Sequence, residues 1–202
     1  MKKPTLVLLA AAVLASPVFA ATEALVVDKT HSEVSFQVRH IVTKVRGYFK
    51  DFEADIQIDK EKPEASSVVF TIKAASIDTA NERRDAHLKS GDFFEAEKYP
   101  NIVFKSSKVV PAGKDRYDVT GVLSLRGVDK VVTLPVTVTG FAKDARGNEK
   151  VGFETVLTVN RKEFGMLWNA ALDNGGVVLG DDVTVNFSLE TQKPRPPAPP
   201  KA

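Results

Sequence analysis

The residues best suited to chemistry lie between Ala80 and Pro100, in a segment that reads ANERRDAHLKSGDFFEAEKYP. Its carboxylates, arginines and histidine are the residue types used in acid–base catalysis and in metal binding. Asp85 and His87 form the obvious pair. Two residues apart on a helix, however, their side chains point about 200° apart, so they do not readily share one metal ion. This spacing does not favour a catalytic or metal site.

The rest of the chain adds little support for such a site. The three histidines, His31, His40 and His87, match no usual zinc spacing. A serine nucleophile would be expected in a strained G-x-S-x-G turn, and the sequence contains none. We therefore predict no catalytic residue, no metal and no cofactor. An enzyme that uses His40 or His87 as a base stays an alternative without a supporting cluster.

A short helix is expected to hold this segment. Thr79 stands three residues before Glu82, a capping-box spacing that predicts a helix over residues 80–89. Gly91 suits the left-handed residue that often ends a helix. The helix interrupts a chain in which apolar and polar residues otherwise alternate with a period of two.

The charged side chains of the predicted helix favour a structural interpretation. Arg84 and Asp85 are expected to tie the helix to the rest of the fold through ion pairs and backbone contacts. A ligand role for either residue stays open. Phe93 and Phe94 follow the helix and break the alternation of the chain, so we expect them to plug one end of the fold.

Most of the chain between Ser32 and Glu190 alternates between apolar and polar residues, which is typical of strands with one buried face. Short turn-like connectors favour antiparallel neighbours. Without helices to cover them, the apolar faces must pack on each other, in a sandwich or a closed barrel. Long sequential hairpins favour the barrel, which leaves no open edge. We predict an all-β fold, an eight-stranded antiparallel up-and-down barrel with the helix between strands three and four. The predicted strands centre on residues 34–38, 51–59, 68–74, 102–104, 117–125, 132–138, 151–159 and 183–189.

The inward faces of these strands predict the lining of the barrel interior. An eight-stranded barrel is either filled by side chains or just wide enough for a small ligand. The residues predicted to line a ligand-binding pore are Val34, Phe36, Val38, Phe52, Ile56, Phe70, Ile72, Phe104, Leu123, Leu134, Val136, Phe153, Leu157 and Phe187.

Four residues are candidates for the mouth of this pore. His40 and Arg161 share faces with apolar residues but lie at strand ends. They either reach solvent at the rim or meet the polar head group of a bound amphiphile. Met166 and Trp168 belong to an apolar insertion between the seventh and eighth strands, and they either line and gate the mouth or plug it.

The ends of the chain indicate export. Lys2 and Lys3 precede an apolar run over residues 6–15, and Val18-Phe19-Ala20 fits a cleavage site. We predict a signal peptide over residues 1–20, cleaved after Ala20, and an exported protein. The apolar run is shorter than the ~20 residues of a membrane helix, so no integral membrane segment is expected in the mature chain. With no cysteine in the sequence, the protein has no disulfide.

Charge and proline content divide the mature chain. Without Lys2 and Lys3 the formal charge of +2 falls to zero, which does not fit a nucleic-acid binder. Residues 21–190 are expected to form the barrel domain. Residues 191–202, TQKPRPPAPPKA, are expected to be a disordered proline-rich tail without helix or sheet, because proline lacks a backbone donor.

Several motifs resemble the YceI-like family in the family's order. They are DxxHSxVxFxVxH (residues 28–40), RGxFxxF (46–52), ASIDTxNxxRDxHLxSxDFF (75–94), KYPxIxFxS (98–106), LRGVxK (125–130) and NRxxFG (160–165). The resemblance covers about residues 24–190 and leaves out the tail. It implies an exported, lipocalin-like barrel whose pore takes an isoprenoid lipid, a polyprenyl phosphate or an isoprenoid quinone. It supplies no catalytic residue.

The sequence thus predicts a periplasmic protein that binds or carries an isoprenoid lipid. A homodimer is possible. The alternative from another class is an interaction module with a filled core, connected with envelope stress or redox chemistry, which docks through the tail or the Met166–Trp168 loop.

Overall fold

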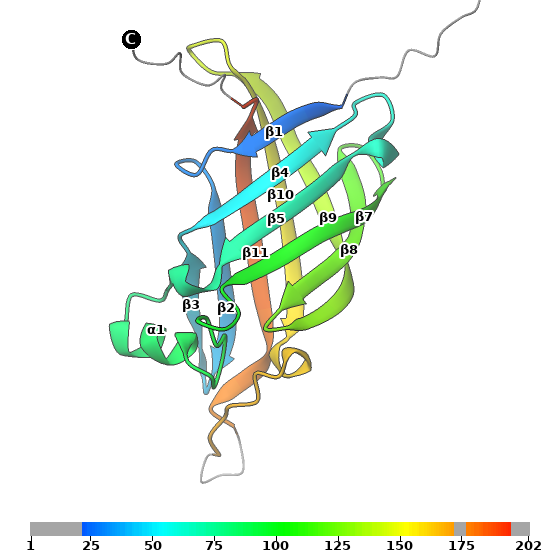
Figure 1. Ribbon diagram of the computed structural model, residues 1–202. Coiled ribbons are helices and arrows are strands. Elements are labelled where there is room, and N and C mark those ends of the chain that lie inside the picture. Colours follow the sequence, from blue (N-terminus) through cyan, green and yellow to red (C-terminus); the bar gives the residue numbers. More distant parts are fainter. Residues whose placement is uncertain (1–21, 172–176, 195–202) are drawn as a thin grey trace, which may run out of the picture.

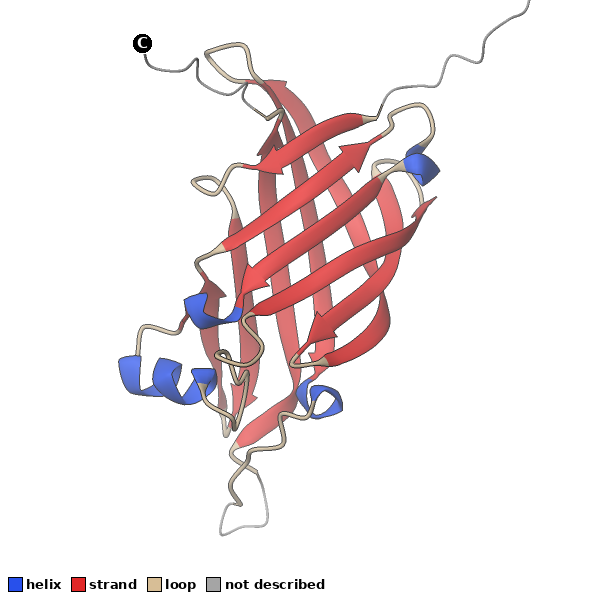
Figure 2. Ribbon diagram, viewed as in Figure 1, coloured by secondary structure: helices blue, strands red, loops and turns tan. Residues whose placement is uncertain are grey.

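The computed structural model describes residues 22–171 and 177–194. These residues form a twisted, elongated barrel of antiparallel strands with short helices near its ends (Figures 1 and 2). The strands are β1 (Glu23–Val27), β2 (Glu33–His40), β3 (Thr43–Phe49), β4 (Phe52–Ile58), β5 (Ser67–Lys73), β6 (Ile77–Asp78), β7 (Asn101–Pro111), β8 (Arg116–Leu125), β9 (Val128–Lys143), β10 (Glu149–Asn160) and β11 (Leu179–Gln192). The helices are α1 (Glu82–Lys89) and the 3-10 helices η1 (Pro63–Ala65), η2 (Ala74–Ser76) and η3 (Arg161–Phe164). None of these described helices has the length and apolar character needed to cross a membrane.

Eight of the described strands close the barrel. Their order is β1-β4-β5-β7-β8-β9-β10-β11, and β11 pairs with β1 to complete the ring. All of these pairings are antiparallel. The predicted eight-stranded antiparallel barrel is therefore confirmed. One strand of the ring differs from the prediction. The predicted first strand corresponds to β2, but the ring contains β1 in its place. Strand β1 has five residues and was too short to show an alternation.

Strand β11 changes its partner along its length. Its C-terminal end pairs with β1, where Val26 lies opposite Gln192. Its N-terminal half pairs with β2, where Val38 lies opposite Val183. From β2 the chain turns into β3, which pairs with the two-residue β6. The wall therefore has different strands at the two ends. We call the end that carries α1, η3 and the β2–β3 turn the α1 end (lower end in Figure 1).

Helix α1 lies between the predicted third and fourth strands, β5 and β7, but it begins differently from the prediction. Its N-cap is Asn81, whose side-chain oxygen accepts a hydrogen bond from the backbone of Arg84 (2.9 Å). The predicted capping box of Thr79 and Glu82 is wrong. Ala80, at φ 58°, turns the chain between Thr79 and the helix.

The end of α1 also differs from the prediction. The helix ends at Ser90, which has an extended backbone, and Gly91 does not take the left-handed conformation. Phe93 is buried, and the ring of Phe94 meets Phe49 edge-on with centroids 5.7 Å apart. The two phenylalanines therefore pack into the α1 end of the barrel, where a plug was predicted.

Strand β11 continues to Gln192, two residues beyond the predicted end of the domain. Thr191 is buried, and its hydroxyl donates a hydrogen bond to the carbonyl of Val151 (2.9 Å). The expectation that the tail lacks sheet structure from residue 191 is therefore wrong. The first proline of the tail is Pro194, so the amides of Thr191 and Gln192 are still available for pairing. The predicted signal peptide and residues 195–202 of the tail lie outside the described residues.

Candidate functional site

A cavity of about 700 Å³ occupies the barrel interior. Its wall consists mainly of aliphatic and aromatic side chains from the inward faces of the strands, among them Phe70, Phe104 and Phe187. Exposed residues join the lining at both ends, Arg83 at the α1 end and Lys60 at the opposite end. The cavity therefore extends along the barrel. Its volume lies within the ~300–1,000 Å³ of typical small-molecule sites.

Most of the predicted pore residues line this cavity. Twelve of the fourteen do so: Phe36, Val38, Ile56, Phe70, Ile72, Phe104, Leu123, Leu134, Val136, Phe153, Leu157 and Phe187. Val34 and Phe52 are 1% and 4% exposed but do not line the cavity, so their prediction is wrong. The ring of Phe52 stacks on Phe70 at 6.0 Å, which places it in the packed core. Contact of the twelve residues with a ligand stays a prediction.

The four predicted mouth residues, His40, Arg161, Met166 and Trp168, all line the cavity. The ring of Trp168 meets the ring of His87 edge-on, with centroids 5.0 Å apart. It lies tilted against the ring of Phe93, with centroids 5.5 Å apart. Met166 is buried and Trp168 is half-buried. Trp168, His87 and Phe93 thus form an aromatic cluster at the α1 end of the cavity.

Arg161 is engaged by the protein itself. Its side chain is 2% exposed, so it does not reach solvent. Nε donates to the carbonyl of Gly180 (2.9 Å), and Nη1 donates to the carbonyls of Met166 (2.6 Å) and Trp168 (2.8 Å). Nη2 donates to Asp181 (3.2 Å). Burial lowers the pKa of Arg161, and the carboxylate of Asp181 opposes that shift. This geometry favours a role in holding the Met166–Trp168 segment over the predicted contact with a head group.

Arg84 and Asp85 have the structural role that the sequence favoured. Arg84 donates to the hydroxyl (2.7 Å) and the carbonyl (2.8 Å) of the buried Thr79. Asp85 accepts hydrogen bonds from the backbone (2.9 Å) and the hydroxyl of Thr79. The predicted backbone contacts are therefore confirmed, whereas the ion pairs are wrong, because the side chains bond to Thr79 instead. His87 lies 2.8 Å from Asp92, so Asp85 and His87 have different partners, as their spacing predicted.

Sequence reasoning missed the cation at the mouth. Arg83 is exposed, lines the cavity and forms no ion pair within the described part of the chain. Arg83 and His87 are four residues apart, so they share one side of α1. The spacing of four residues was the signal in the sequence that could have placed Arg83 at the mouth. His87 contacts Phe93, one of the apolar residues that follow the helix, and Arg83 lies on the same side of α1.

Sequence reasoning also missed Thr155, a polar residue inside the barrel. Thr155 lies opposite Phe187 on one neighbouring strand and Val136 on the other, and all three line the cavity. Its hydroxyl is buried without a hydrogen-bond partner among the described residues. The alternation of β10 places Thr155 on the inward face with Phe153 and Leu157, and this was the signal.

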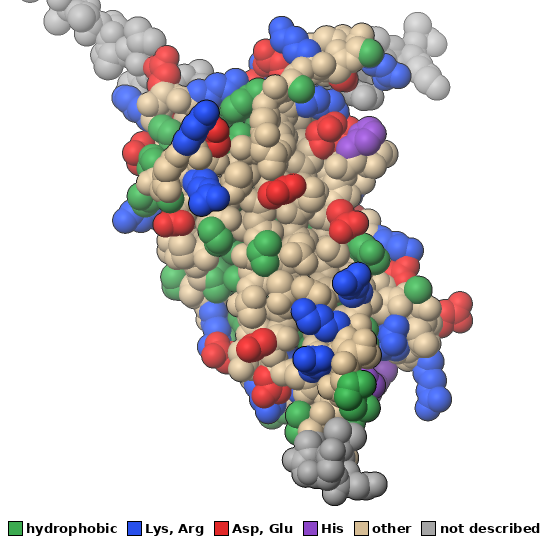
Figure 3. Space-filling model, turned by 180° about the vertical axis from the view of Figure 1, so that it is seen from behind, with side chains coloured by type: hydrophobic (Ala, Val, Ile, Leu, Met, Phe, Trp, Pro, Cys, Tyr) green, Lys and Arg blue, Asp and Glu red, His purple; other side chains and the backbone are tan. Residues whose placement is uncertain are grey.

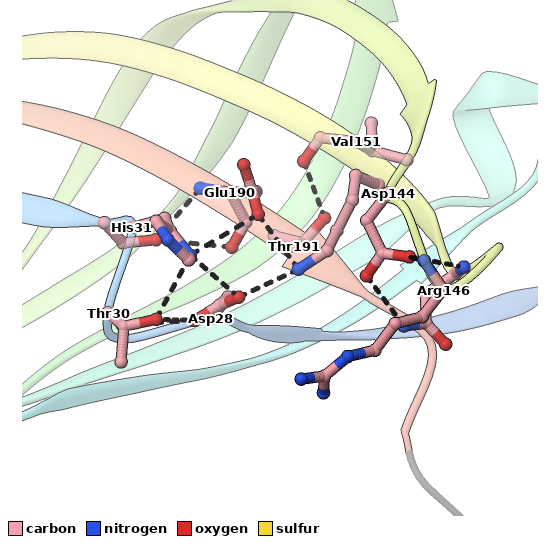
Figure 4. A network of polar contacts seen from close by, with 11 residues as sticks. Asp28, Thr30, His31, Asp144, Arg146, Val151, Glu190 and Thr191 are labelled. Atoms are coloured by element: carbon pink, nitrogen blue, oxygen red, sulfur yellow. Dashed lines mark hydrogen bonds and ion pairs between the residues drawn. The ribbon is translucent and has the colours of Figure 1, made fainter.

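A separate group of charges lies at the corner between β1 and β2 (Figure 4). Side-chain atoms of Asp28, His31 and Glu190 lie within 4.8 Å of one another, which the sequence did not reveal. Lys150 lies 2.8 Å from Asp28 and 2.9 Å from Glu190, and it supplies the positive charge that these carboxylates need. Hydrogen bonds from Lys150, and from Thr30 and His31, hold the pKa of Asp28 well below its usual range. The group is an ion-pair network that joins the corner to β10 and β11.

Known proteins share this sequence and architecture. The family described as YceI-like domain matches residues 25–191. A UPF0312 protein of Azotobacter vinelandii is 38% identical over 165 residues, which cover 78% of this chain and 86% of the relative. The crystal structure of BcnA from Burkholderia cenocepacia matches with a TM-score of 0.72 and 31% identity, covering 81% of this chain and 98% of BcnA.

A more distant structure shares the fold. It is a polyisoprenoid binding domain from Saccharophagus degradans, with a TM-score of 0.64 over 85% of this chain and 99% of that domain. At 17% identity this likeness concerns the fold alone. The family match extends from β1 to the end of β11, and with the sequence relatives it shows that the chain belongs to the YceI-like family.

Proposed function

We propose that the protein binds a long isoprenoid lipid in the barrel cavity and carries or sequesters it in the periplasm. The observation that carries this proposal is the elongated apolar cavity of about 700 Å³. An isoprenoid chain has no hydrogen-bonding groups along its length, so an apolar wall buries it without leaving polar groups unpaired. Burial of some hundreds of Å² contributes on the order of 10 kcal/mol before ordering costs, at roughly 25 cal/mol per Å².

The apolar wall of the cavity supports an occupant. Water inside an apolar cavity finds few hydrogen-bond partners. A hydrocarbon chain displaces this water and makes dispersion contacts with the wall.

The polar groups at the α1 end support the predicted ligand class, a polyprenyl phosphate or an isoprenoid quinone. Arg83 is an exposed cation in the cavity wall, and a phosphate head group gains charge-assisted hydrogen bonds from it. The side-chain oxygen of Asn81 caps α1, which leaves the NH2 group of this amide as a donor to a quinone carbonyl. The Saccharophagus domain with this fold is itself described as polyisoprenoid binding.

The remaining expectations belong to the same proposal. The signal-like N-terminal sequence supports export to the periplasm. We propose a binding role without catalysis, because Arg84 and Asp85 are occupied in structural contacts and His87 is paired with Asp92. The possible homodimer stays a prediction. The alternative of an interaction module required a filled core, which a cavity of about 700 Å³ does not favour.

Native mass spectrometry tests the proposal on protein purified from its own periplasm, followed by organic extraction of any bound lipid. A stoichiometric isoprenoid is the expected result, and it identifies the cargo directly. In parallel, lipid-free protein is offered a prenyl phosphate and an isoprenoid quinone in detergent. A bare mass together with no uptake of either lipid contradicts the carrier function.

A further inference from the structure

The turn between β2 and β3 has residues that do not suit a tight turn. His40 pairs with Thr43, which leaves a two-residue loop of Ile41 and Val42. Such loops favour Gly or Asn where φ is positive, and a loop with positive φ at its first residue only favours Gly at that position. Ile41 has φ 49°, a conformation that β-branched residues rarely adopt. Ile41 is also 45% exposed and Val42 is 86% exposed. Local stability therefore does not explain two apolar side chains at this position.

Further apolar side chains lie exposed beside this turn. The backbone of Ile41 donates a hydrogen bond to the carbonyl of Val178 (2.9 Å), next to Val177, which is 57% exposed. The backbone of Val178 donates to Ala170 (3.0 Å), in the segment that contains Leu167, which is 67% exposed. We call this group the apolar tip: Ile41, Val42, Leu167 and Val177.

The apolar tip borders the cavity. His40, which precedes Ile41, lines the cavity, and so does Trp168, which follows Leu167. The exposed apolar residues and the cavity wall are thus neighbours in the chain on two separate segments. Any surface that the tip contacts lies beside the α1 end of the cavity.

The outer face of the β2–β3 hairpin is cationic. Arg39 lies directly opposite Lys44, and Arg46 follows two residues later on the same strand. All three are exposed, and none forms an ion pair in residues 22–171 or 177–194. Like charges directly opposite each other destabilise a sheet. Arg39 also donates to the carbonyl of Val42 (3.2 Å), which places a cation at the apolar tip. Figure 3, which views the molecule from behind, shows several Lys and Arg side chains near its lower end, with hydrophobic side chains below them and acidic side chains to one side.

We propose that the α1 end docks onto an anionic lipid bilayer, with the apolar tip inserted among the acyl chains and the three cations at the lipid head groups. Apolar residues backed by Lys and Arg are the combination that binds such surfaces. Docking places the cavity mouth against the membrane, so that an isoprenoid passes between them without crossing water. The role of docking in lipid transfer rests on the proposed carrier function.

Protection of a sheet edge is the competing explanation for the charges. Strand β3 pairs with β6 only at Tyr48 and Phe49, so its first half is an edge, and Lys or Arg on an edge prevents pairing with other chains. This explains Lys44 and Arg46. It does not explain Ile41 and Val42, because exposed apolar residues at an edge promote association.

Vesicle flotation with lipid-free protein tests the docking. Wild-type protein is expected to float with vesicles of phosphatidylglycerol and phosphatidylcholine, to do so less at high salt, and not to float with pure phosphatidylcholine. The double variant Ile41→Gly, Val42→Asn is the decisive one. It places Gly where φ is positive, so it should fold at least as well as the wild type, yet its vesicle affinity should fall at least tenfold because two apolar anchors are lost.

Charge reversal gives the second variant and its matched control. Arg39→Glu with Lys44→Glu should lower vesicle affinity roughly 25-fold or more, at about fivefold per lost cation. Lys114→Glu with Lys143→Glu makes the same change in net charge at exposed positions at the opposite end of the barrel, one in the β7–β8 turn and one at the end of β9, and its affinity should stay within about twofold.

Two results overturn the proposal: unchanged vesicle affinity of the variant Ile41→Gly, Val42→Asn, or equal flotation with anionic and neutral vesicles. Uptake of a prenyl phosphate from detergent separates the two functions. Uptake without vesicle binding removes the docking and leaves the carrier function standing. Vesicle binding without uptake removes the carrier function and leaves the docking standing.

Discussion

At the scale of single residues, the hydroxyl of Thr155 is the one polar side-chain atom of the cavity lining that is buried without a partner among the described residues. A buried unsatisfied hydroxyl costs roughly 1–3 kcal/mol. Thr155→Val should therefore raise the free energy of unfolding of lipid-free protein by about 1 kcal/mol, as measured by urea denaturation. Thr158→Val, on the exposed face of the same strand, is the control, with a change within about 0.5 kcal/mol. Destabilisation by Thr155→Val would show that the hydroxyl has a partner.

Arg83 separates the two classes of cargo. Its charge faces the α1 end of the cavity and is free to meet an anionic head group. Arg83→Glu should weaken the binding of a prenyl phosphate about fivefold or more, and should change quinone binding less than twofold. Lys105→Glu, on the exposed outer face of β7, carries the same change in charge and should leave both affinities unchanged. Equal losses for both lipids would contradict a head-group contact at Arg83.

At the scale of elements, Arg161 joins η3 to the Met166–Trp168 segment and to the start of β11. Arg161→Leu leaves the carbonyls of Met166, Trp168 and Gly180 without this donor and removes one of the two cations beside Asp181, so it should cost about 3 kcal/mol or more of unfolding free energy. Trp168 is the only tryptophan in the sequence, so its emission reports on this segment and should shift to the red. Lys162→Leu removes an exposed partner of Asp181 and should leave the emission unchanged. A red shift of equal size in both variants would contradict the role of Arg161.

The ion-pair network at the corner between β1 and β2 makes the free energy of unfolding depend on pH in the acid range. Hydrogen bonds from Lys150, Thr30 and His31 lower the pKa of Asp28 below its usual value of 3.8. The folded state therefore binds a proton at Asp28 less readily than the unfolded state does, and the stability that Asp28 contributes is present above about pH 4 and is lost as the pH falls further. Asp28→Asn should flatten this part of the curve of unfolding free energy against pH. The variant Asp118→Asn, on β8 away from the corner, should keep the wild-type slope.

At the scale of the whole molecule, binding of the proposed lipid should be coupled to stability. A ligand that binds only the folded state stabilises it by about 2.7 kcal/mol at a hundredfold excess over Kd. For a domain of this size, loading should raise Tm by roughly 5–10 °C. Differential scanning fluorimetry of lipid-free protein, with and without a prenyl phosphate, checks this. A short-chain phosphate without the isoprenoid tail is the control, and an equal shift with it would contradict burial of the chain.

The barrel and most of its lining were predictable because alternation is a local signal. Phe153 and Leu157 are four residues apart in β10, so local strand geometry alone places them on the same face. Because one face of the strand is buried, only one pairing register keeps both side chains in the interior. Phe52 shares the inward pattern of the lining residues but packs in the core. Alternation identifies the inward face of a strand without showing where the interior is filled.

The parts that escaped prediction depend on contacts distant in sequence. Lys150 reaches Asp28 across 122 residues, and Arg161 is buried by carbonyls whose positions follow from the path of a loop. Thr79 matched the spacing of a helix cap, but Arg84 and Asp85 engage its side chain. Side chains that can hydrogen-bond in several ways are settled by the tertiary structure, not by local spacing.

The exchange of partners along β11 makes the two ends of the tube unequal. At one end β11 pairs with β1 and completes the ring of hydrogen-bonded strands, whereas at the other end it pairs with β2, and the wall continues through β3 to the two-residue β6. Strand β6 has no second strand partner among the described residues, so the ring of strand pairs is not closed at the α1 end. For a lipid bound in the cavity, exchange at the α1 end would break none of the hydrogen bonds that close the ring.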